Sequence, residues 1–207
     1  MTRRLLTTVM ALCVLASVAN AAPSVYLKLK ANGNEILGGS PVASLGREGS
    51  IQCLSFSMGV SAPRTASGQL TGKRQYEPLV ITKPLDRSSV LLLKALTGNE
   101  VCECEFRFFR PGQAGAEQHY YTVTLGNAYL SAVRQRVPEP GAGVVEEVEF
   151  TYEDITWTWV DGGLQHQDKV TNLAASSGAA SVPLSDAKPV PPIRPRIQGA
   201  LKPKPEG

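Results

Sequence analysis

The chain has 207 residues, of which 43% are hydrophobic, and a formal net charge of +3. The excess positive charge lies at the two ends, so residues 22–169 are close to neutral and lack the one-sided basic surface of a nucleic-acid-binding protein. The apolar segment of residues 5–19 is shorter than the roughly 20 residues that a membrane-spanning helix needs, and no later segment approaches that length. Composition therefore excludes nucleic-acid binding and a membrane span.

The two ends differ from the middle of the chain. Two arginines precede the apolar segment, and Ala19-Asn20-Ala21 fits the small-residue rule for signal peptidase. We interpret residues 1–21 as a signal peptide, which predicts a protein exported to the periplasm or secreted. Residues 170–207 are rich in Ala, Ser and Pro and have too little contiguous apolar sequence to offset the entropy of ordering, so we predict a disordered tail.

Short alternating segments predict strands from residue 24 onward. Residues 24–30 alternate, and Asn32-Gly33-Asn34 behind them is a turn signal. Residues 36–49 are rich in Gly and Ser and predict a loop. The β-forming residues of 50–60 predict a second strand.

Residues 61–73 show no period and carry Gly, Ser and Pro, which predicts a long exposed loop. Such loops are often contact surfaces. Residues 74–83 predict a third strand, and Pro78 within it indicates a sheet edge or a bulge, because proline cannot donate to a central ladder. At an edge, another subunit could complete the sheet.

A helix is predicted at residues 87–97, with Gly98 just past its end. Either of two residues can cap its start, Asp86 or Ser88. Three turns are too short to be stable alone, so we expect the side with Leu92 and Leu96 to pack on a sheet.

The strand predicted at residues 101–109 places Cys102, Cys104 and Phe106 on one face. With Cys53 the mature chain keeps three cysteines, an odd number that argues against a disulfide framework. We interpret the thiols as small buried hydrophobes. The less favoured alternative is a zinc site that also includes His119.

The remaining strands are predicted at residues 120–125 and 128–137, with a turn at Gly126-Asn127 between them. In residues 146–160 the apolar face changes parity, which predicts a bulge near Glu153-Asp154. In sum, the sequence predicts one mainly β domain at residues 22–169, an antiparallel two-sheet β-barrel or β-sandwich with one short flanking α-helix.

No motif indicates catalysis, since the sequence lacks a G-x-S-x-G elbow, a P-loop and a dinucleotide-binding pattern. We therefore expect neither enzymatic activity nor a cofactor or metal. Glu147, Glu149 and Glu153 lie opposite Phe150 in a strand, which favours a solvated face over a pair of catalytic carboxylates.

Trp157 and Trp159 share their parity with Ile155, which favours core packing over a sugar-binding platform. The alternative function is a secreted β-sandwich binding module, for example for carbohydrate, using these tryptophans with Tyr120 and Tyr121.

Several motifs in a fixed order carry a family resemblance. Those around the helix are Ser67-Gly68-Gln69, Gly72-Lys73-Arg74, Tyr76, Pro78-Leu79, Lys83, Asp86, Ser88-Ser89 and residues 91–96. The others are Tyr26-Leu27-Lys28, Gly33, residues 106–111, Tyr121-Thr122-Val123, Glu146-Glu147-Val148, residues 155–159 and Asp161-Gly162-Gly163. Together they cover residues 24–168 and resemble the haemolysin-coregulated protein (Hcp) family, the tube protein of the type VI secretion system.

The resemblance implies two packed sheets with a flanking helix, assembling as a homo-hexameric ring whose copies stack into a hollow tube. In that family a contracting sheath drives the tube into a target cell, so the implied partners are sheath and spike proteins and small effector cargo in the lumen. The family has no catalytic residues. Its loop after the second strand contributes to contacts between stacked rings, and the corresponding residues are Ser61, Arg64, Ser67, Gln69, Lys73 and Arg74.

Two features depart from the family. Tube proteins normally lack a cleavable signal and assemble in the cytoplasm before secretion, whereas residues 1–21 predict export. This indicates a secreted relative that forms rings without driving injection. The Pro-rich tail is too short and too polar for an enzymatic effector domain and favours a flexible linker or an interaction segment.

Overall fold

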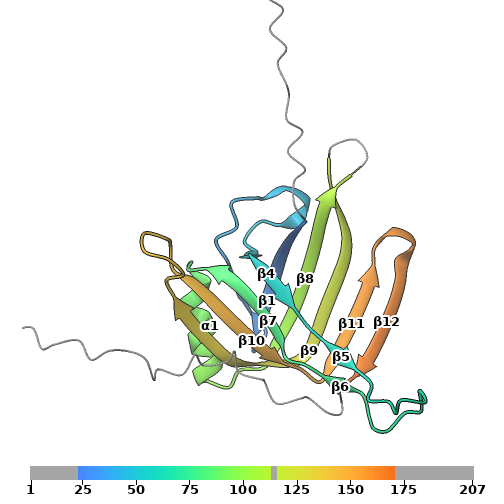
Figure 1. Cartoon of the computed structure of the whole chain (residues 1–207). Helices are drawn as coiled ribbons and strands as arrows, with labels where there is room; N and C mark the ends of the chain where they lie inside the picture. The colour runs from blue at the N-terminus through green and yellow to red at the C-terminus, as the bar shows by residue number, and fades with distance from the viewer. Residues whose placement is uncertain (1–22, 113–115, 171–207) are drawn as a thin grey trace, which may run out of the picture. The chain divides into compact units, whose positions relative to one another are not determined.

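The computed structural model describes residues 23–112 and 116–170 (Figure 1). The predicted signal peptide lies outside these residues, as does the predicted tail apart from Val170. Within the described residues, no helix is long and apolar enough to cross a membrane.

The described part contains twelve strands, one α-helix and two short 3₁₀ helices. In chain order they are β1 (Ser24–Ala31), β2 (Asn34–Ile36), η1 (Ser44–Gly46), β3 (Ile51–Cys53), β4 (Ser55–Ser57), β5 (Val60–Ser61), β6 (Gln75–Tyr76), β7 (Leu79–Pro84), α1 (Ser88–Thr97), β8 (Cys102–Pro111), β9 (Glu117–Arg136), β10 (Val145–Thr151), β11 (Asp154–Trp159), η2 (Asp161–Gly163) and β12 (Leu164–Lys169).

The strands form two antiparallel sheets that share β9. Sheet A runs from β2 and β3 through β1, β8 and the first half of β9 to β11 and β12. Sheet B consists of the second half of β9 with β10, β7 and β4. A separate two-stranded ladder joins β5 and β6. This confirms the predicted mainly β, antiparallel two-sheet fold with one helix, as a sandwich and not a closed barrel (Figure 1).

The core lies between the two sheets. Phe106 of sheet A meets Phe150 of sheet B with ring centroids 5.9 Å apart, and Phe56 of β4 packs edge-on against Phe106 at 5.3 Å. Leu27 and Ile81 are fully buried in the same cluster. Burial of these large side chains supplies most of the driving force for folding.

One prediction fails at β9, where the expected turn at Gly126-Asn127 is instead a bend inside one continuous strand. Leu125 pairs with Cys104 and Ala128 with Cys102, so β9 holds one extra residue there. Asn127 takes φ 48°, and its side-chain amide donates to Asp154 at 2.8 Å. Gly126 and Asn127 therefore form a bulge instead of a turn, and after this bulge β9 continues from sheet A into sheet B.

Two predicted strands are each divided. Residues 50–60 form β3, which pairs with β1 in sheet A, and β4, which pairs with β7 in sheet B. Residues 74–83 form β6 and β7, and Pro78 lies between them instead of inside an edge strand or bulge. The edge of sheet B is β4, because β7 has a neighbour on each side.

The helix is confirmed within one residue of its predicted start. Asp86 accepts a hydrogen bond from the Ser88 backbone N–H at 2.9 Å, which satisfies one of the free donors of the first turn. Leu92 is fully buried. Gly98 has helical dihedrals, and the left-handed position after the helix belongs to Asn99, with φ 48°.

Candidate interaction surfaces

The six residues predicted for ring stacking are all exposed and lie in or beside the long loop between β5 and β6. Arg64 donates to the Gly68 carbonyl at 2.9 Å, and the Gln69 backbone N–H donates to Thr65 Oγ1 at 3.1 Å. The loop therefore has its own internal hydrogen bonds, although it contributes no side chain to the hydrophobic core.

The base of this loop is attached to β12. Arg74 contacts Asp168 with Nη2 3.0 Å from Oδ1, and the hydroxyl of buried Tyr76 donates to the other carboxylate oxygen. The hydrogen bond from Tyr76 holds the pKa of Asp168 below its ordinary value. Arg74 is thus engaged within the chain. Figure 1 shows that the loop between β5 and β6 projects beyond the sheets.

A second candidate surface is the core-facing side of sheet A at β11 and β12. Along β11 this side is fully buried at Ile155, half-buried at Trp157 and 39% exposed at Trp159. Leu164, which pairs with Trp159, is 74% exposed. The prediction that both tryptophans pack in the core is therefore confirmed for Trp157, whose side chain is partly buried against the core, and wrong for Trp159.

The exposure increases because sheet B ends before it reaches these strands. β11 and β12 make no extensive contact with β10, β7 or β4. We call the uncovered region the open face, defined by Tyr121, Trp157, Trp159, Leu164 and His166. It borders two grooves of about 270 Å³ and about 390 Å³ that share Trp157 and His166 in their linings, and the second extends to Arg74, Tyr76 and Asp168.

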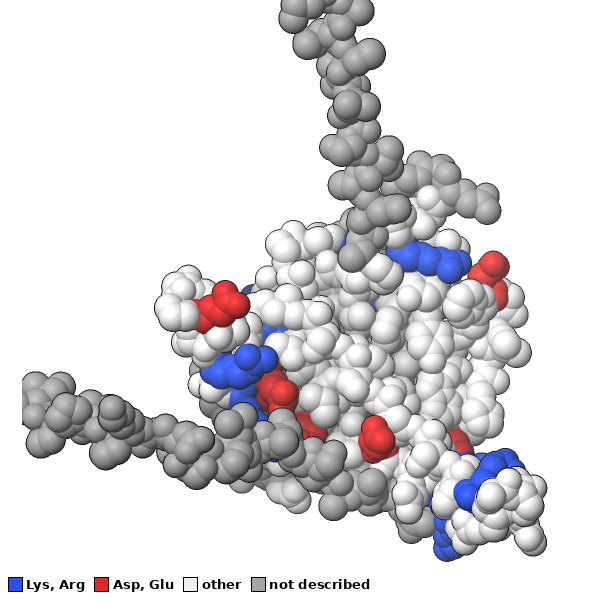
Figure 2. Space-filling model, in the orientation of Figure 1, with Lys and Arg blue, Asp and Glu red and all other residues white. Residues whose placement is uncertain are grey.

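The aromatic rings of the open face pack against neighbouring rings and against an arginine. The indole of Trp157 and the imidazole of His166 stack with centroids 5.6 Å apart and an interplanar angle of 11°. Trp159 lies 5.7 Å from Tyr120, and the Arg110 guanidinium is 5.4 Å from the Trp159 ring. Figure 2, drawn in the orientation of Figure 1, shows few charged side chains on the near side of the molecule.

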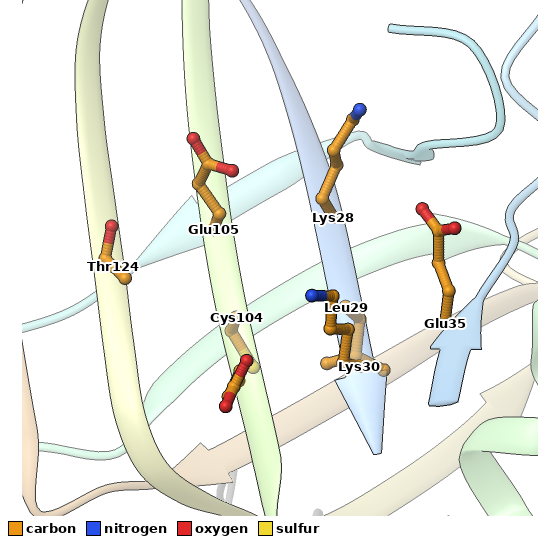
Figure 3. A pocket seen from close by; sticks show the side chains of 8 residues that line it. Lys28, Leu29, Lys30, Glu35, Cys104, Glu105 and Thr124 are labelled. Atoms are coloured by element: carbon orange, nitrogen blue, oxygen red, sulfur yellow. The ribbon is translucent and has the colours of Figure 1, made fainter. Parts of the chain in front are cut away.

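A third feature is a groove of about 240 Å³ on the opposite, solvent-facing side of sheet A (Figure 3). Its charges alternate between strands, since Lys28 pairs in register with Glu105 and Lys30 with Glu103. Glu35 of β2 completes the lining. Opposite charges in neighbouring rows give no concentrated potential, so this groove is a polar surface without the features of an ion-binding site.

The structure also contains buried charges that the sequence analysis missed. Lys83 is fully buried and contacts Glu146 at 2.7 Å and Asp86 at 2.9 Å. Burial alone raises the pKa of Glu146, but hydrogen bonds from Lys83, Ser89 and Gln135 outweigh it and hold the pKa below its ordinary value. This cluster joins β7, β10 and the first turn of α1.

Glu147, Glu149 and Glu153 were predicted to present a solvated face, and this is wrong for Glu149. Glu146, for which no such prediction was made, is buried as well. Glu146 is 0% and Glu149 is 4% exposed, the latter with Arg134 at 3.2 Å. The signal for the first was present in the pattern, because Lys83 alternates with buried Leu79 and Ile81 as Glu146 does with Val148.

The cysteines are placed as expected from their pattern. Cys53, Cys102 and Cys104 are free and buried. Burial raises the pKa of Cys53 to about 12 and that of Cys102 to about 11, so neither thiol forms the reactive thiolate near neutral pH. Residues 23–112 and 116–170 contain no group of three or more His, Cys, Asp or Glu side chains that could hold a metal ion, and the zinc alternative with His119 has no support there.

Comparison with known proteins points to one family. Residues 26–159 match the family described as "Type VI secretion system effector, Hcp". The chain is 37% identical over 131 residues to the "Major exported protein" of Pseudomonas aeruginosa, covering 59% of this chain and 76% of that protein. Its fold is similar to that of the Hcp1 protein from E. coli EAEC 042, with a TM-score of 0.64, 35% identity, and coverage of 72% of this chain and 99% of that one. For the secreted protein Hcp3 from Pseudomonas aeruginosa the TM-score is 0.60 and the identity 28%, with coverage of 72% and 99%.

Proposed function

Because the chain belongs to the Hcp family of type VI secretion proteins, we propose that it is a structural subunit that assembles into a homo-hexameric ring, and that the rings stack into a hollow tube. Its role is assembly and not catalysis. The sheath, spike and effector proteins of the secretion system are its proposed partners. The sequence of residues 1–21 and the similarity to an exported protein support export of this copy.

The open face is the observation that carries this proposal. A β-sheet normally buries its apolar face against another layer, and here the layer provided by sheet B ends before β11 and β12. Exposed Trp159 and Leu164 are the kinds of side chains that soluble proteins cover with a partner. A second copy of the chain would supply the missing layer.

The first test is the mass of the purified protein by size-exclusion chromatography with light scattering. We expect a hexamer, and negative-stain images should show rings. The variant Trp159→Glu places a charge in the proposed contact and should shift the protein to the monomer. Val137→Glu changes a residue that is 56% exposed in another loop and should assemble like the unchanged protein. A monomer at high concentration would contradict the proposal.

We propose that stacking uses the loop between β5 and β6, which carries Ser61, Arg64, Ser67, Gln69, Lys73 and Arg74. Its exposure and its internal hydrogen bonds support a pre-ordered contact surface. Replacing residues 63–72 by a short Gly-Ser link should leave single rings but abolish stacks in electron micrographs. Stacks that survive this replacement would place the contact elsewhere.

The exposed aromatic side chains also keep a second function open, a carbohydrate-binding module. Trp157 and Trp159 border grooves that contain the polar residues Arg74 and Asp168. However, the Trp157 ring stacks on His166, which leaves less of its face for a sugar. Glycan-array binding that is lost in a folded Trp157→Ala variant would favour this function, and the absence of binding would dismiss it.

A further inference from the structure

We infer that the ring contact is heterologous: the open face of one copy receives the exposed side of α1 from the next copy. This inference rests on the proposed ring assembly and adds which two surfaces meet. A patch that pairs with itself about a two-fold axis closes as a dimer, whereas a ring needs two different complementary patches on each subunit. The first patch is the open face, and the second must lie elsewhere on the chain.

The helix α1 is the second patch because it is apolar around most of its circumference. Leu92 and Ala95 are buried against the chain, where α1 packs on β9. On the other side Val90 is 73%, Leu91 40% and Leu93 38% exposed. A helix that is hydrophobic all round is expected to be buried on all sides, and described residues cover only one side of this one.

The two patches agree in shape and in length. The open face borders grooves, whereas a helix surface is convex, so the helix can be received by the grooves as in other helix-in-groove contacts. Ten residues of α1 extend about 15 Å. Six residues of β11 extend about 20 Å, enough to accommodate that length.

Their placement in the fold also suits a head-to-tail contact. The open face lies on β11 and β12, the last strands of sheet A, whereas α1 packs on β9 and is linked to sheet B by the hydrogen bond from Ser89 to Glu146 of β10. Figure 1 shows α1 and β12 on opposite sides of the sandwich. One subunit can therefore use both patches at the same time, one with each neighbour, as ring closure requires.

The experiment uses two single variants, one in each patch. Trp159→Glu disables the open face. Val90→Glu disables the helix patch without harming the helix, because an acidic side chain in the first turn is favourable there. Far-UV circular dichroism and thermal unfolding should show that both variants fold. Each alone should raise the protein concentration at half-assembly by more than tenfold, while Val137→Glu should not.

Mixing the two variants gives the decisive result. Between them they keep one intact open face and one intact helix, so an equal mixture should form a dimer and nothing larger, measured by light scattering. Rings formed by Val90→Glu alone would overturn the inference and leave the proposed ring assembly standing. A mixture that stays monomeric would also overturn it. If the unchanged protein is itself monomeric, the proposed function fails, which is a separate outcome.

Discussion

Lys83 is a charged residue placed in a hydrophobic core, and its environment explains how this is tolerated. Its ammonium group contacts the carboxylates of Glu146 and Asp86 and donates to the Ser89 hydroxyl at 3.1 Å and the Pro84 carbonyl at 2.7 Å. Every donor therefore has a partner. A buried ion pair adds little net stability, but removing one partner leaves an uncompensated buried charge.

The variant Lys83→Met should therefore lower the free energy of unfolding by about 3–5 kcal/mol. It should also raise the pKa of Glu146, because the first of the hydrogen bonds that lower it is lost. Urea unfolding at pH 7 measures the first effect. The double variant Lys83→Met with Glu146→Leu removes the two fully buried charges and should recover most of the loss, because the remaining Asp86 is partly exposed and still accepts hydrogen bonds from the Gly39 and Ser88 N–H groups. A double variant no more stable than the single one would argue against this account.

Arg47 is a second buried charge, in a segment that the sequence predicted to be a loop. It is 1% exposed, with its guanidinium carbon 4.5 Å from the Phe109 ring and 5.2 Å from the Tyr26 ring. Glu117 accepts its hydrogen bond. The alternation of strands predicted buried cysteines correctly, but it carries no information about a charged residue enclosed by distant segments.

At the scale of elements, sequence patterns predicted most strands but not where they change sheet. The core-facing side chains change parity at both places, from Leu125 to Ala128 in β9 and from Cys53 to Phe56 between β3 and β4. A change of parity alone does not show whether the chain turns back or continues into the other sheet. The parity change in residues 146–160 was informative. The predicted bulge near Glu153-Asp154 corresponds to the break between β10 and β11, where the chain passes from sheet B to sheet A.

At Gly38, the loop between β2 and β3 passes very close to the backbone at the start of β3. A Cβ on Gly38 would lie 2.4 Å from the Ser50 carbonyl oxygen and 2.6 Å from the Ile51 backbone nitrogen. Neither backbone atom can move without displacing β3, which pairs with β1.

We therefore expect Gly38→Ala to destabilise the protein by about 1–3 kcal/mol, as overpacking does. Thermal unfolding followed by circular dichroism measures this as a lower Tm. The matched control is Gly143→Ala, since a Cβ there meets nothing within 4 Å. Equal Tm values for the two variants would show that the loop adjusts at little cost.

For the whole molecule, the fold class and the family were predictable, because ordered motifs identify both. The open face was not, since it depends on how far sheet B extends over sheet A, and this follows from the sheet changes that the sequence left undetermined. The exposed side of α1 was missed for a related reason. A short run of Leu and Val predicts a packed helix, but it does not show which side remains free.

The carboxylates of buried Glu146 and half-buried Asp86 also predict how the whole molecule responds to acid. The pKa of Glu146 is held below its ordinary value by hydrogen bonds from Lys83, Ser89 and Gln135, which outweigh the effect of burial. For Asp86, burial likewise raises the pKa, and hydrogen bonds from Ser88, Lys83 and the Gly39 N–H outweigh it.

A carboxyl whose pKa is lower in the folded than in the unfolded state stabilises the fold above the unfolded value and loses that contribution as the pH falls through the folded value. The free energy of unfolding should therefore stay level from pH 7 to about pH 5 and fall below the unfolded values of 4.5 for Glu146 and 3.8 for Asp86. Urea unfolding at successive pH values measures this. Glu146→Gln should be less stable at pH 7 but show a smaller further loss in acid. An equal acid loss in that variant would assign the effect to other carboxyls.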